Sequence, residues 1–551
     1  MEDIKNAEVE IPNLLRKINE PRVLEHNTLV EIERFFDSNL DYNQKEAAIK
    51  TMSLASGSEI LLIQGPPGTG KTTTIVEIVK QLLYRHRHWK ILIASQSNQA
   101  VDNVLEKIYQ TGSEEKILRI GNEEKMSDIA KQFTPDKVLD TLIKDNRNRI
   151  KENTIIDKNL QIQTELQALQ KDFYKSLQNI TSKLSQDKGS KEYNLATLFI
   201  KNIRLVFGTL LGISSWQNFR DIAFDIVIVD EAGRATLSEL LVPCVKARKI
   251  VFVGDHKQLA PVIDDEIIKN LNSFTKQEVT ISFFERLFEK LEKSNKDGIQ
   301  HLEHFKHRLI YNYRAEDRIC QLYNQPFYGG ELETAKAIEG KREHYLSIFN
   351  SSVVWFDTSK RNDREDEQKG TSKINRCNVL VIEYKLREIL QGMKEKNIKN
   401  SIGIITPYKA QVDLLEKMLG SIKKDFKEYY RHNLDSNQDK DLRNGFDIGT
   451  VDSFQGSDRD IIIYDCVRAS KSKNSFENRN KRKGSKINFI ADEKRLNVSL
   501  SRAKKLLIIV GDIEFLYTAS ISEGENPFYK IIGYIQKNKE LYQIVNAEEV
   551  K

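Results

Sequence analysis

The sequence has few cysteines and no long apolar run. Its 551 residues include only the four cysteines Cys244, Cys320, Cys377 and Cys466, which lie far apart and form no CxxC pair. This spacing excludes a CxxC metal site and an obvious disulfide framework, so we expect a reducing compartment, cytoplasmic or otherwise intracellular. No apolar run approaches the ~18–20 residues of a membrane span, and the acidic start of the chain lacks the apolar core of a secretory signal.

The composition is rich in charge but leaves enough apolar residues for several cores. Charged residues make up 30% and apolar residues 39% of the sequence, and the mean hydropathy is −0.51. A chain of 551 residues predicts about three or four domains. The net charge of +6 permits a basic groove for nucleic-acid phosphates, although such a groove depends on how the charges cluster.

The segment Gly65–Thr72 reads GPPGTGKT and has the most specific pattern in the chain. It follows the apolar run Ile60–Ile63, which predicts a buried strand, and precedes a helix-forming segment from Thr72 to about Tyr84. A strand, a GxxxxGKT loop and a helix in this order are typical of a phosphate-binding loop. The alternative, a plain glycine-rich turn, is disfavoured by the flanking strand and helix.

This loop predicts binding of a nucleoside triphosphate with Mg²⁺. Backbone N–H groups of the glycine-rich turn would surround the phosphates, and the start of the helix adds partial positive charge. Lys71 supplies a mobile cation, and the Thr72 hydroxyl is placed to ligate Mg²⁺. The residues expected to contact the nucleotide are Gly65, Pro66, Pro67, Gly68, Thr69, Gly70, Lys71, Thr72 and Thr73.

Two further predicted strands end in polar residues. The apolar run 225–229 ends in Asp230 and Glu231, and the run 250–253 leads to Gln258. Asp230 can hold Mg²⁺, and Glu231 can accept a proton from an attacking water. An Asp-Glu pair alone would equally suit a solvated loop. Gln258 would join them at the carboxyl ends of the strands, where ligands of open α/β sheets collect.

Together these sites resemble the superfamily 1 helicases, specifically the up-frameshift/senataxin-like group of superfamily 1B, over roughly residues 38–515. Further segments match the family motifs in order: Leu40–Gln44 (Q motif), Ile91–Asp102 (motif Ia), Val206–Leu210 (the next nucleic-acid motif), Tyr311–Arg314 (motif IV), Ile404–Gln411 (a strand and loop), Thr450–Gly456 (motif V) and Leu496–Ala503 (motif VI). The resemblance implies an α/β fold with two RecA-like parallel-sheet domains of the P-loop NTPase type and an all-helical insertion in the first.

The resemblance also implies roles in ATP hydrolysis. Gln44 would hydrogen-bond adenine, and Tyr313 would stack on it. Arg314 and Arg502 resemble the family's arginine fingers, which neutralise charge on the γ-phosphoryl oxygens. Because both fall after residue 300, we expect hydrolysis in a cleft between two domains. For an isolated arginine, a surface ion pair would be the alternative. The expected catalytic set is Lys71, Glu231, Gln258, Arg314 and Arg502.

The sequence departs from the family pattern at three places. Arg234 and Asn312 stand where the family often has Gln. Asp458 replaces the family's usual Glu after motif V, so the expected ribose contact falls to a shorter side chain. Gly456 completes the expected nucleotide contacts and, with Gln258 and Gln455, would link the γ-phosphate state to strand binding. None of these departures removes a catalytic group.

The resemblance implies 5′→3′ movement on single-stranded DNA or RNA. The sequence does not choose between the two, since single-strand contacts go largely to phosphates and base faces. Two alternatives are a nucleic-acid-stimulated ATPase that remodels a partner without unwinding and a nucleotide-gated scaffold that does not hydrolyse ATP. The intact catalytic set argues against the scaffold. The expected strand contacts are Ser97, Asn98, Thr209, Pro407, Tyr408, Thr450 and Ser453.

The domain boundaries follow from the predicted strands, which alternate with helical segments and so predict parallel sheets. The strands predicted for the first domain are Ile60–Ile63, Ile91–Ala94, Leu205–Phe207, Ile226–Val229 and Ile250–Val253. Those predicted for the second are Val353–Phe356, Ile402–Ile405, Ile448–Val451, Ile461–Tyr464 and Leu506–Val510. We expect an N-terminal helical brace at 1–37, a first RecA-like domain at 38–110 and 200–300, a helical insertion at 111–199, a second RecA-like domain at 301–535 and a C-terminal tail at 536–551. The segment ahead of Gln44 is too short for the β-barrel that relatives carry there, so we expect the barrel to be missing or a protein partner to supply that surface.

The insertion carries a helical repeat of apolar residues, Ile162, Leu166, Leu169, Phe173, Leu177, Ile180 and Leu184. This spacing predicts an amphipathic helix, which would either clamp the strand or pack on its parent domain. The basic segment Lys471–Lys486 is either a solvated loop, a nucleic-acid contact or a localisation signal. Asp357 with Glu367–Lys369 loosely imitates a nuclease pattern, but we expect Glu367–Lys369 to form a loop, so we attribute the match to chance.

Overall fold

In the computed structural model the chain forms two compact units, defined by which residues contact one another. The first unit contains residues 1–64, 71–256 and 260–308, and the second contains residues 65–70, 257–259 and 309–551. The structure describes residues 29–54, 60–112, 115–156, 172, 175–176, 178–180, 182–183, 198, 200–216, 222–262, 281–296, 305–433, 445–454, 456–470, 487–522 and 524–549.

A parallel sheet of seven strands forms the centre of the first unit, in the order β3-β4-β2-β5-β6-β1-β7. The strands are β1 (Ile60–Gln64), β2 (Ile91–Ser95), β3 (Ile117–Ile120), β4 (Leu205–Thr209), β5 (Phe224–Asp230), β6 (Ala247–Gly254) and β7 (Lys306–Arg308). Every residue of β2 is buried, as expected for a parallel strand covered on both faces. The five strands that the sequence predicts for this sheet are all present.

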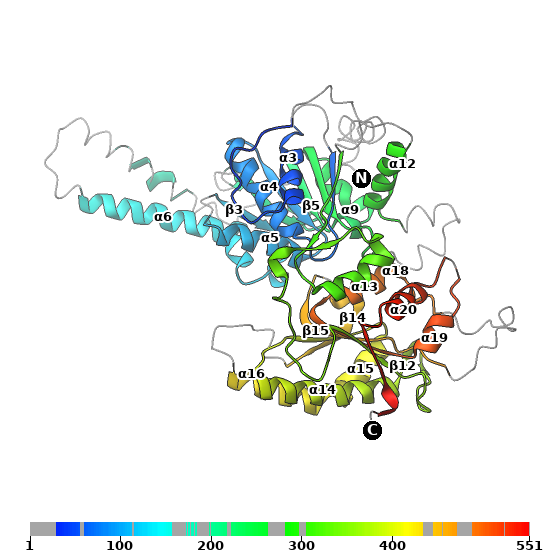
Figure 1. Cartoon of the computed structure of the whole chain (residues 1–551). Coiled ribbons are helices and arrows are strands. Elements are labelled where there is room, and N and C mark those ends of the chain that lie inside the picture. Colours follow the sequence, from blue (N-terminus) through cyan, green and yellow to red (C-terminus); the bar gives the residue numbers. More distant parts are fainter. Residues whose placement is uncertain are drawn as a thin grey trace. The chain divides into compact units, whose positions relative to one another are not determined.

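Helices cover both faces of this sheet. They are α3 (Tyr42–Met52), α4 (Lys71–Arg85), α5 (Asn98–Gln110), α6 (Pro135–Ile156), α9 (Leu237–Cys244) and α12 (Phe283–Lys296). Figure 1 shows α4 and α5 on one face, α9 and α12 on the other, and α6 extending away from the sheet. Leu92 and Val227, which are in register on neighbouring strands, belong to one buried cluster with Phe284 and Phe288 of α12.

The structure corrects several predicted boundaries of the first unit. Strand β3 lies within the segment 111–199, which was expected to be all helical, and pairs with β4. Strand β7 lies beyond residue 300 and pairs with β1. Residues 29–37 form no helix, so this part of the expected brace is wrong, and residues 1–28 lie outside the described residues.

The apolar repeat of the expected insertion falls almost wholly outside the described residues. Of its seven positions only Ile180 is described, and that side chain is 45% exposed. Whether this helix clamps a strand or packs on its parent domain therefore stays a prediction. The described part of the insertion consists mainly of β3 and α6.

The second unit is built on a parallel sheet of six strands in the order β14-β13-β15-β16-β10-β17. The strands are β10 (Val353–Asp357), β13 (Ile402–Thr406), β14 (Asp447–Thr450), β15 (Arg459–Asp465), β16 (Ala503–Gly511) and β17 (Gln543–Asn546). All five strands predicted for this sheet are present. Strand β17 pairs with β10, so residues 536–551 are not a tail outside the domain.

Alternate residues of β10 face two separate cores of the second unit. Val354 and Phe356 belong to one buried cluster, and Val353 and Trp355 belong to the other. The period of two is that of a strand with both faces covered. The helices are α13 (Asp317–Tyr328), α14 (Arg376–Lys396), α15 (Lys409–Met418), α16 (Gly420–Asn433), α17 (Val451–Phe454), α18 (Glu493–Leu500), α19 (Ile513–Thr518) and α20 (Pro527–Lys537).

Two small strand pairs complete the described part of the second unit. Strands β8 (Tyr311–Asn312) and β9 (Glu333–Thr334) pair in parallel, and β11 (Glu367–Lys369) and β12 (Ser372–Ile374) form an antiparallel hairpin. The finding that Glu367–Lys369 is a strand corrects the expectation of a loop there. Among the described residues, no helix is both long enough and apolar enough to span a membrane.

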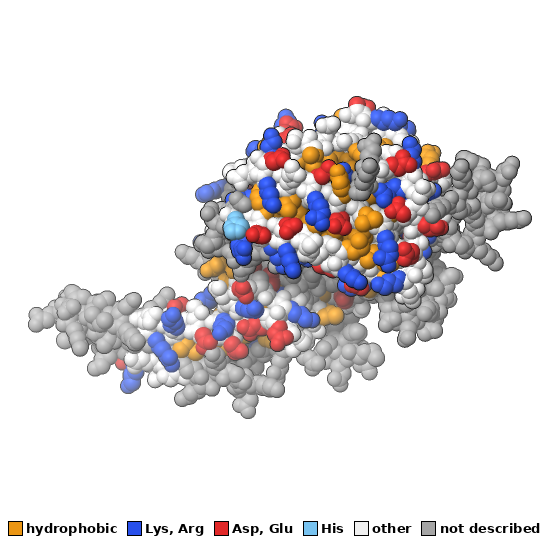
Figure 2. All heavy atoms as spheres, turned by 90° about the horizontal axis from the view of Figure 1, so that it is seen from below, with side chains coloured by type: hydrophobic (Ala, Val, Ile, Leu, Met, Phe, Trp, Pro, Cys, Tyr) orange, Lys and Arg blue, Asp and Glu red, His pale blue; other side chains and the backbone are white. Residues whose placement is uncertain are grey.

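Charges of both signs are interspersed on the face of the molecule shown in Figure 2. Helix α14 carries such pairs on its surface, with Lys385 Nζ 2.7 Å from Glu388 Oε2 and Arg387 Nη2 3.0 Å from Glu383 Oε1. Surface pairs such as that of the exposed Arg387 contribute little stability but break up fields of one sign. The described part of this face therefore has no continuous basic groove.

Candidate nucleotide and nucleic-acid sites

The expected nucleotide residues of the first unit lie at the carboxyl edge of its sheet. Lys71 and Thr72 begin α4, which follows β1, and Asp230 is the last residue of β5. Ser95 at the end of β2 is in register with Asp230, and Gln64 at the end of β1 is in register with Gly254. The side chains that the sequence assigns to phosphate, metal and water therefore gather where ligands of such sheets bind.

Asp230 is buried, and its Oδ1 accepts a hydrogen bond from the Glu231 N–H at 2.9 Å. Burial, followed by the neighbouring Glu231, raises the pKa of Asp230 to about 7, and Lys71 opposes the shift. A carboxylate whose charged form is this poorly stabilised by the protein gains from a bound cation. The oxygen donors of Asp230 and Thr72 are of the type that Mg²⁺ prefers, so these residues fit the expected metal.

Glu231 adopts a left-handed backbone conformation, with φ 55° and ψ 34°. Such a conformation costs a residue with a Cβ on the order of 1 kcal/mol and clusters at functional sites. Glu231 follows the end of β5 and precedes the short 3₁₀ turn Ala232–Arg234. The backbone therefore leaves the strand direction directly after Asp230.

The phosphate loop makes a close contact within the second unit. The Tyr313 N–H donates to the Gly68 carbonyl oxygen at 2.8 Å. Gly68 has φ 76°, and a Cβ there would lie 2.6 Å from both Arg314 Cβ and Asn312 Oδ1. Only glycine fits this position, for its backbone conformation and for its space.

Asn312 has a structural role that the sequence comparison alone did not suggest. Its side chain is fully buried, and its Oδ1 accepts from the N–H groups of Arg314 at 3.0 Å and Ala315 at 3.2 Å. Its Nδ2 donates to the Ala315 carbonyl at 2.8 Å. The Asn that stands where the family often has Gln therefore fixes the turn that presents Tyr313 and Arg314.

The first candidate finger, Arg314, is held by an ion pair. Its Nε lies 3.1 Å from Asp458 Oδ2, and its Nη1 donates to the Ser501 carbonyl at 3.1 Å. The other oxygen of Asp458 lies 2.7 Å from Lys504 Nζ. Burial alone would raise the pKa of Asp458, but Arg314 and Lys504 outweigh burial and lower that pKa. The ribose contact expected of Asp458 stays a prediction.

The second candidate finger, Arg502, is buried. It is 2% exposed, its Nη2 donates to Gln258 Oε1 at 3.0 Å, and its Nε donates to the Val498 carbonyl at 3.1 Å. Asn497 supports the same contact because its Nδ2 donates to the Lys257 carbonyl at 2.7 Å. Arg502 is therefore not the surface ion pair that would be the alternative for an isolated arginine.

The two expected adenine contacts are held by neighbouring groups. Gln44 is buried at the third position of α3, and its Oε1 accepts from the Asp41 N–H at 3.2 Å in a capping box. The carbonyl of Tyr313 accepts from Arg342 Nη2 at 3.0 Å. Gly456, expected to lie near the nucleotide, has φ 83°. Gln455 lies outside the described residues.

Three expected strand contacts gather at the carboxyl edge of the first sheet. Ser97 caps α5, where its side chain accepts from the Ala100 N–H at 3.1 Å, and Asn98 is the first residue of that helix. Thr209 ends β4 in register with Ser95 of β2. A helix start and neighbouring strand ends are suited to phosphate contacts, because their N–H groups are not all used within the helix.

The expected strand contacts of the second unit gather at the ends of β13 and β14. Thr450 ends β14 in register with Thr406 of β13, which is followed by Pro407 and Tyr408. The hydroxyl of Ser453 donates to the Thr450 carbonyl at 2.7 Å. These residues lie at an edge equivalent to that of the first sheet.

An aromatic side chain that the sequence did not single out lies beside Tyr408. The ring centroids of Tyr408 and Phe489 are 5.4 Å apart with the planes 29° from parallel, and Phe489 is 43% exposed. The Arg495 guanidinium lies 4.3 Å from the Phe489 ring centroid. Phe489 follows the basic segment Lys471–Lys486, which lies outside the described residues, and no pattern in the sequence marks it.

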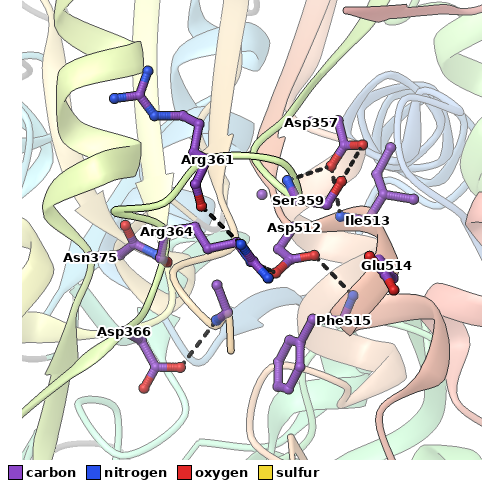
Figure 3. Close-up of polar contacts among 12 residues, drawn as sticks. Asp357, Ser359, Arg361, Arg364, Asp366, Asn375, Asp512, Ile513, Glu514 and Phe515 are labelled. Carbon is purple, nitrogen blue, oxygen red and sulfur yellow. Dashed lines mark hydrogen bonds and ion pairs between the residues drawn. The ribbon is translucent and has the colours of Figure 1, made fainter. Parts of the chain in front are cut away.

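Asp357, from the nuclease-like pattern, serves as a local cap (Figure 3). Its Oδ1 accepts from the N–H groups of Ser359 at 3.0 Å and Ile513 at 3.1 Å. Nearby, Arg364 Nε lies 3.1 Å from Asp512 Oδ2. The carboxylates of Asp357, Asp366 and Asp512 in Figure 3 are thus engaged in fixing the local backbone. The described residues contain no group of three or more His, Cys, Asp or Glu side chains able to hold a metal.

Comparison with known proteins places both units in one family. Models of the AAA domain match residues 39–266 and residues 280–514. The DNA polymerase alpha-associated DNA helicase A of Saccharomyces cerevisiae is 28% identical over 91% of this chain and 69% of its own length. The regulator of nonsense transcripts 1 homolog of Drosophila melanogaster is 29% identical over 85% of this chain and 34% of its own length.

A solved structure of arterivirus nonstructural protein 10, a helicase, aligns with 85% of this chain and 62% of its own length, at 13% identity and a TM-score of 0.34. A likeness at that level adds nothing to the assignment, which rests on the AAA domain matches and the relatives. The chain belongs to superfamily 1B of the helicases and is an ATP-hydrolysing enzyme of that group.

Proposed function

We propose that this protein hydrolyses ATP to move 5′→3′ along single-stranded DNA or RNA, and that hydrolysis requires catalytic residues of both units. Lys71, Thr72, Asp230 and Glu231 would come from the first unit, and Arg314 and Arg502 from the second. The direction of movement follows the resemblance to superfamily 1B. The choice between DNA and RNA is left to the experiment.

The observation that carries the proposal is the hydrogen bond from Arg502 Nη2 to Gln258 Oε1. Arg502 is a buried cation, and a buried cation needs an acceptor. A γ-phosphate oxygen is a stronger acceptor than an amide, because it carries charge. ATP would therefore draw Arg502 to the phosphate and release Gln258, so that one exchange of partners couples nucleotide state to the segment Lys257–Leu259.

Each residue of the first unit has a separate task in this proposal. Lys71 would bind the β- and γ-phosphates, and Glu231 would orient water and take its proton. Asp230 and Thr72 would hold Mg²⁺, which would neutralise phosphate charge when bound. The raised pKa of Asp230 supports this role, because a bound cation favours its charged form.

The proposed strand contacts at the edges of both sheets support movement along a single strand. Asn98 and Thr209 lie at the edge of the first sheet, and Pro407 and Thr450 lie at the edge of the second. A translocase needs two strand-binding sites whose affinities change with nucleotide state. We also propose a reducing compartment, supported by the four cysteines, which are all buried and free.

The test compares ATP turnover by the full chain alone, with single-stranded DNA, with single-stranded RNA and with duplex. The proposal expects large stimulation by at least one single strand and none in Glu231→Gln. Duplexes with a 5′ or a 3′ single-stranded tail then test direction. Stimulation without displacement of either duplex would favour the ATPase that remodels a partner, and preferential displacement with the 3′ tail would overturn the proposed direction.

A further inference from the structure

We propose that Arg119 is a positioning residue for strand binding, which turns the side-chain amide of Asn98 so that its NH₂ group faces a bound strand. This inference rests on the proposed function, because it assigns Asn98 a strand contact. Arg119 lies on β3, in a segment that the sequence predicted to be a helical insertion, and none of the family motifs includes it. It would add a residue to the strand site without touching the strand itself.

The Arg119 side chain is fully buried and makes three directed hydrogen bonds. Its Nε donates to Asp102 Oδ1 at 2.7 Å, its Nη1 to the Ile120 carbonyl at 2.6 Å, and its Nη2 to Asn98 Oδ1 at 2.9 Å. Gly121, which follows β3, leaves room for this arrangement, since a Cβ there would lie 3.3 Å from Arg119 Nη1. Every nitrogen of the guanidinium is therefore used.

The chemistry of arginine settles which way the Asn98 amide points. A guanidinium only donates hydrogen bonds, so the atom of Asn98 that faces it must be the carbonyl oxygen. The NH₂ group then points away from Arg119, and no hydrogen bond from it to another described residue is seen. Asn98 is partly exposed at the start of α5, where backbone N–H groups also await acceptors. An outward donor there suits phosphate oxygens and base acceptors.

Stability alone gives a weak reason for this arrangement. A buried ion pair usually contributes little more than a well-packed apolar pair, because both charges lose water. Here the pair is also fixed from a second side, since Asp102 Oδ2 accepts from the Ser127 N–H at 2.8 Å. The planar fork of arginine presents separate nitrogens to Asp102 and Asn98, whereas a lysine has a single nitrogen and no fixed fork. The geometry thus serves the direction of the Asn98 amide.

The test is a double-mutant cycle between Arg119→Lys and Asn98→Ala in the full chain. Arg119→Lys keeps a cation beside Asp102 but loses the bond to Asn98. We expect each single variant to weaken binding of a labelled oligonucleotide about three- to tenfold, the range of one hydrogen bond. In the Asn98→Ala background, Arg119→Lys should have no further effect. The strand concentration for half-maximal ATPase should rise in parallel, while kcat at saturating strand stays unchanged.

Arg204→Lys is the matched control. Arg204 precedes β4 at the opposite end of the same sheet, and its fork bonds Glu115 and the His86 and Trp89 carbonyls. Its loss should lower the thermal midpoint without changing strand affinity. If Arg119→Lys is too unstable to assay, Asn98→Asp replaces it, because that variant keeps the acceptor for Arg119 and turns the outward donor into a charged oxygen that repels phosphate. It should weaken strand binding more than Asn98→Ala does.

These measurements distinguish a failure of the proposed role of Arg119 from a failure of the proposed function. A wild-type chain that binds no single strand overturns both. If the wild-type chain binds a single strand and Arg119→Lys or Asn98→Asp binds it equally well, the inference alone is overturned. An equal loss from Arg119→Lys in the wild-type and Asn98→Ala backgrounds also overturns it, because Arg119 would then act through the fold and not through Asn98.

Discussion

Arg314 and Asp458 form an ion pair, with 3.1 Å between Nε and Oδ2, and Asp458 is also bound by Lys504. The candidate finger is thus already neutralised by a carboxylate of its own unit. Any γ-phosphate that recruits Arg314 must compete with that carboxylate. With Arg314 as the proposed finger, this ion pair would oppose hydrolysis until the phosphate displaces Asp458.

We expect Asp458→Ala to raise the basal ATPase several-fold, because Arg314 no longer has to leave a carboxylate. Turnover at saturating strand should change little. Steady-state ATPase with and without oligonucleotide measures both. Asp413→Ala is the control, since Asp413 makes an exposed pair with Lys409 on α15. A basal rate that falls to that of Arg314→Ala would contradict this and would favour the ribose contact.

Lys71→Ala should remove ATP turnover, while Glu231→Gln should preserve ATP binding and block hydrolysis. The first loses a cation that binds phosphate in the ground state, and the second loses only the base that takes a proton from water. A general base typically contributes ~10²- to 10⁴-fold. Nucleotide binding and ATPase assays on both variants test this separation. Wild-type turnover by Glu231→Gln would show that another group is the base.

Arg502→Ala should abolish strand stimulation of the ATPase, with a loss on the order of 10³-fold at saturating strand. The reason is that the variant lacks both the finger and the partner of Gln258. The stimulated rate is measured against Arg387→Ala, which removes a 55%-exposed arginine paired with Glu383 on α14. Full stimulation of Arg502→Ala would overturn its assignment as a finger.

Asp465 gives a prediction on stability and pH. It ends β15 fully buried, and its oxygens accept from Asn378 Nδ2 at 2.7 Å and Gln411 Nε2 at 2.6 Å. Burial raises the pKa of Asp465 to about 6, although both amides lower it. The folded state thus holds this proton more tightly than the unfolded chain. Its contribution to stability is therefore present at low pH and is lost as the pH rises from about 4 to about 6.

Comparison with Asp465→Asn isolates this effect, because the asparagine does not titrate. The free energy of unfolding of the wild type minus that of the variant should fall by up to ~3 kcal/mol between pH 4 and pH 6.5, and stay level above that. Urea denaturation across this range measures it. A difference that is constant, or that grows with pH, contradicts the prediction.

Most of the strands that the sequence predicted are apolar and central in their sheets, because burial on both faces favours an unbroken apolar run. Ile91–Ser95 and Ile402–Thr406 are examples, and both are buried at every position. The strands missed from the two large sheets, β3, β7 and β17, lie at the sheet edges, where one side is open and the run is short. Thus β7 consists of Lys306, His307 and Arg308, and β17 has no fully buried residue.

The candidate site was predicted to the extent that it lies on local motifs. The phosphate loop and the ends of β1 and β5 could be placed because a strand, a turn and a helix follow one another in the sequence. The parts that could not be predicted depend on contacts between distant segments. Arg119 lies 17 residues from Asp102 in the sequence, and Phe489 meets Tyr408 only through the fold.

With Glu231 as the proposed base, its left-handed backbone would place a cost in stability at a residue needed for catalysis. Glycine or asparagine accepts that conformation more readily, so Glu231→Gly and Glu231→Asn should relieve strain on the order of 1 kcal/mol while losing the base. Such variants would be inactive and yet resist heat better than the natural enzyme. They would also hold ATP unhydrolysed for long periods, which makes them better starting points than Glu231→Gln for trapping the protein on a strand.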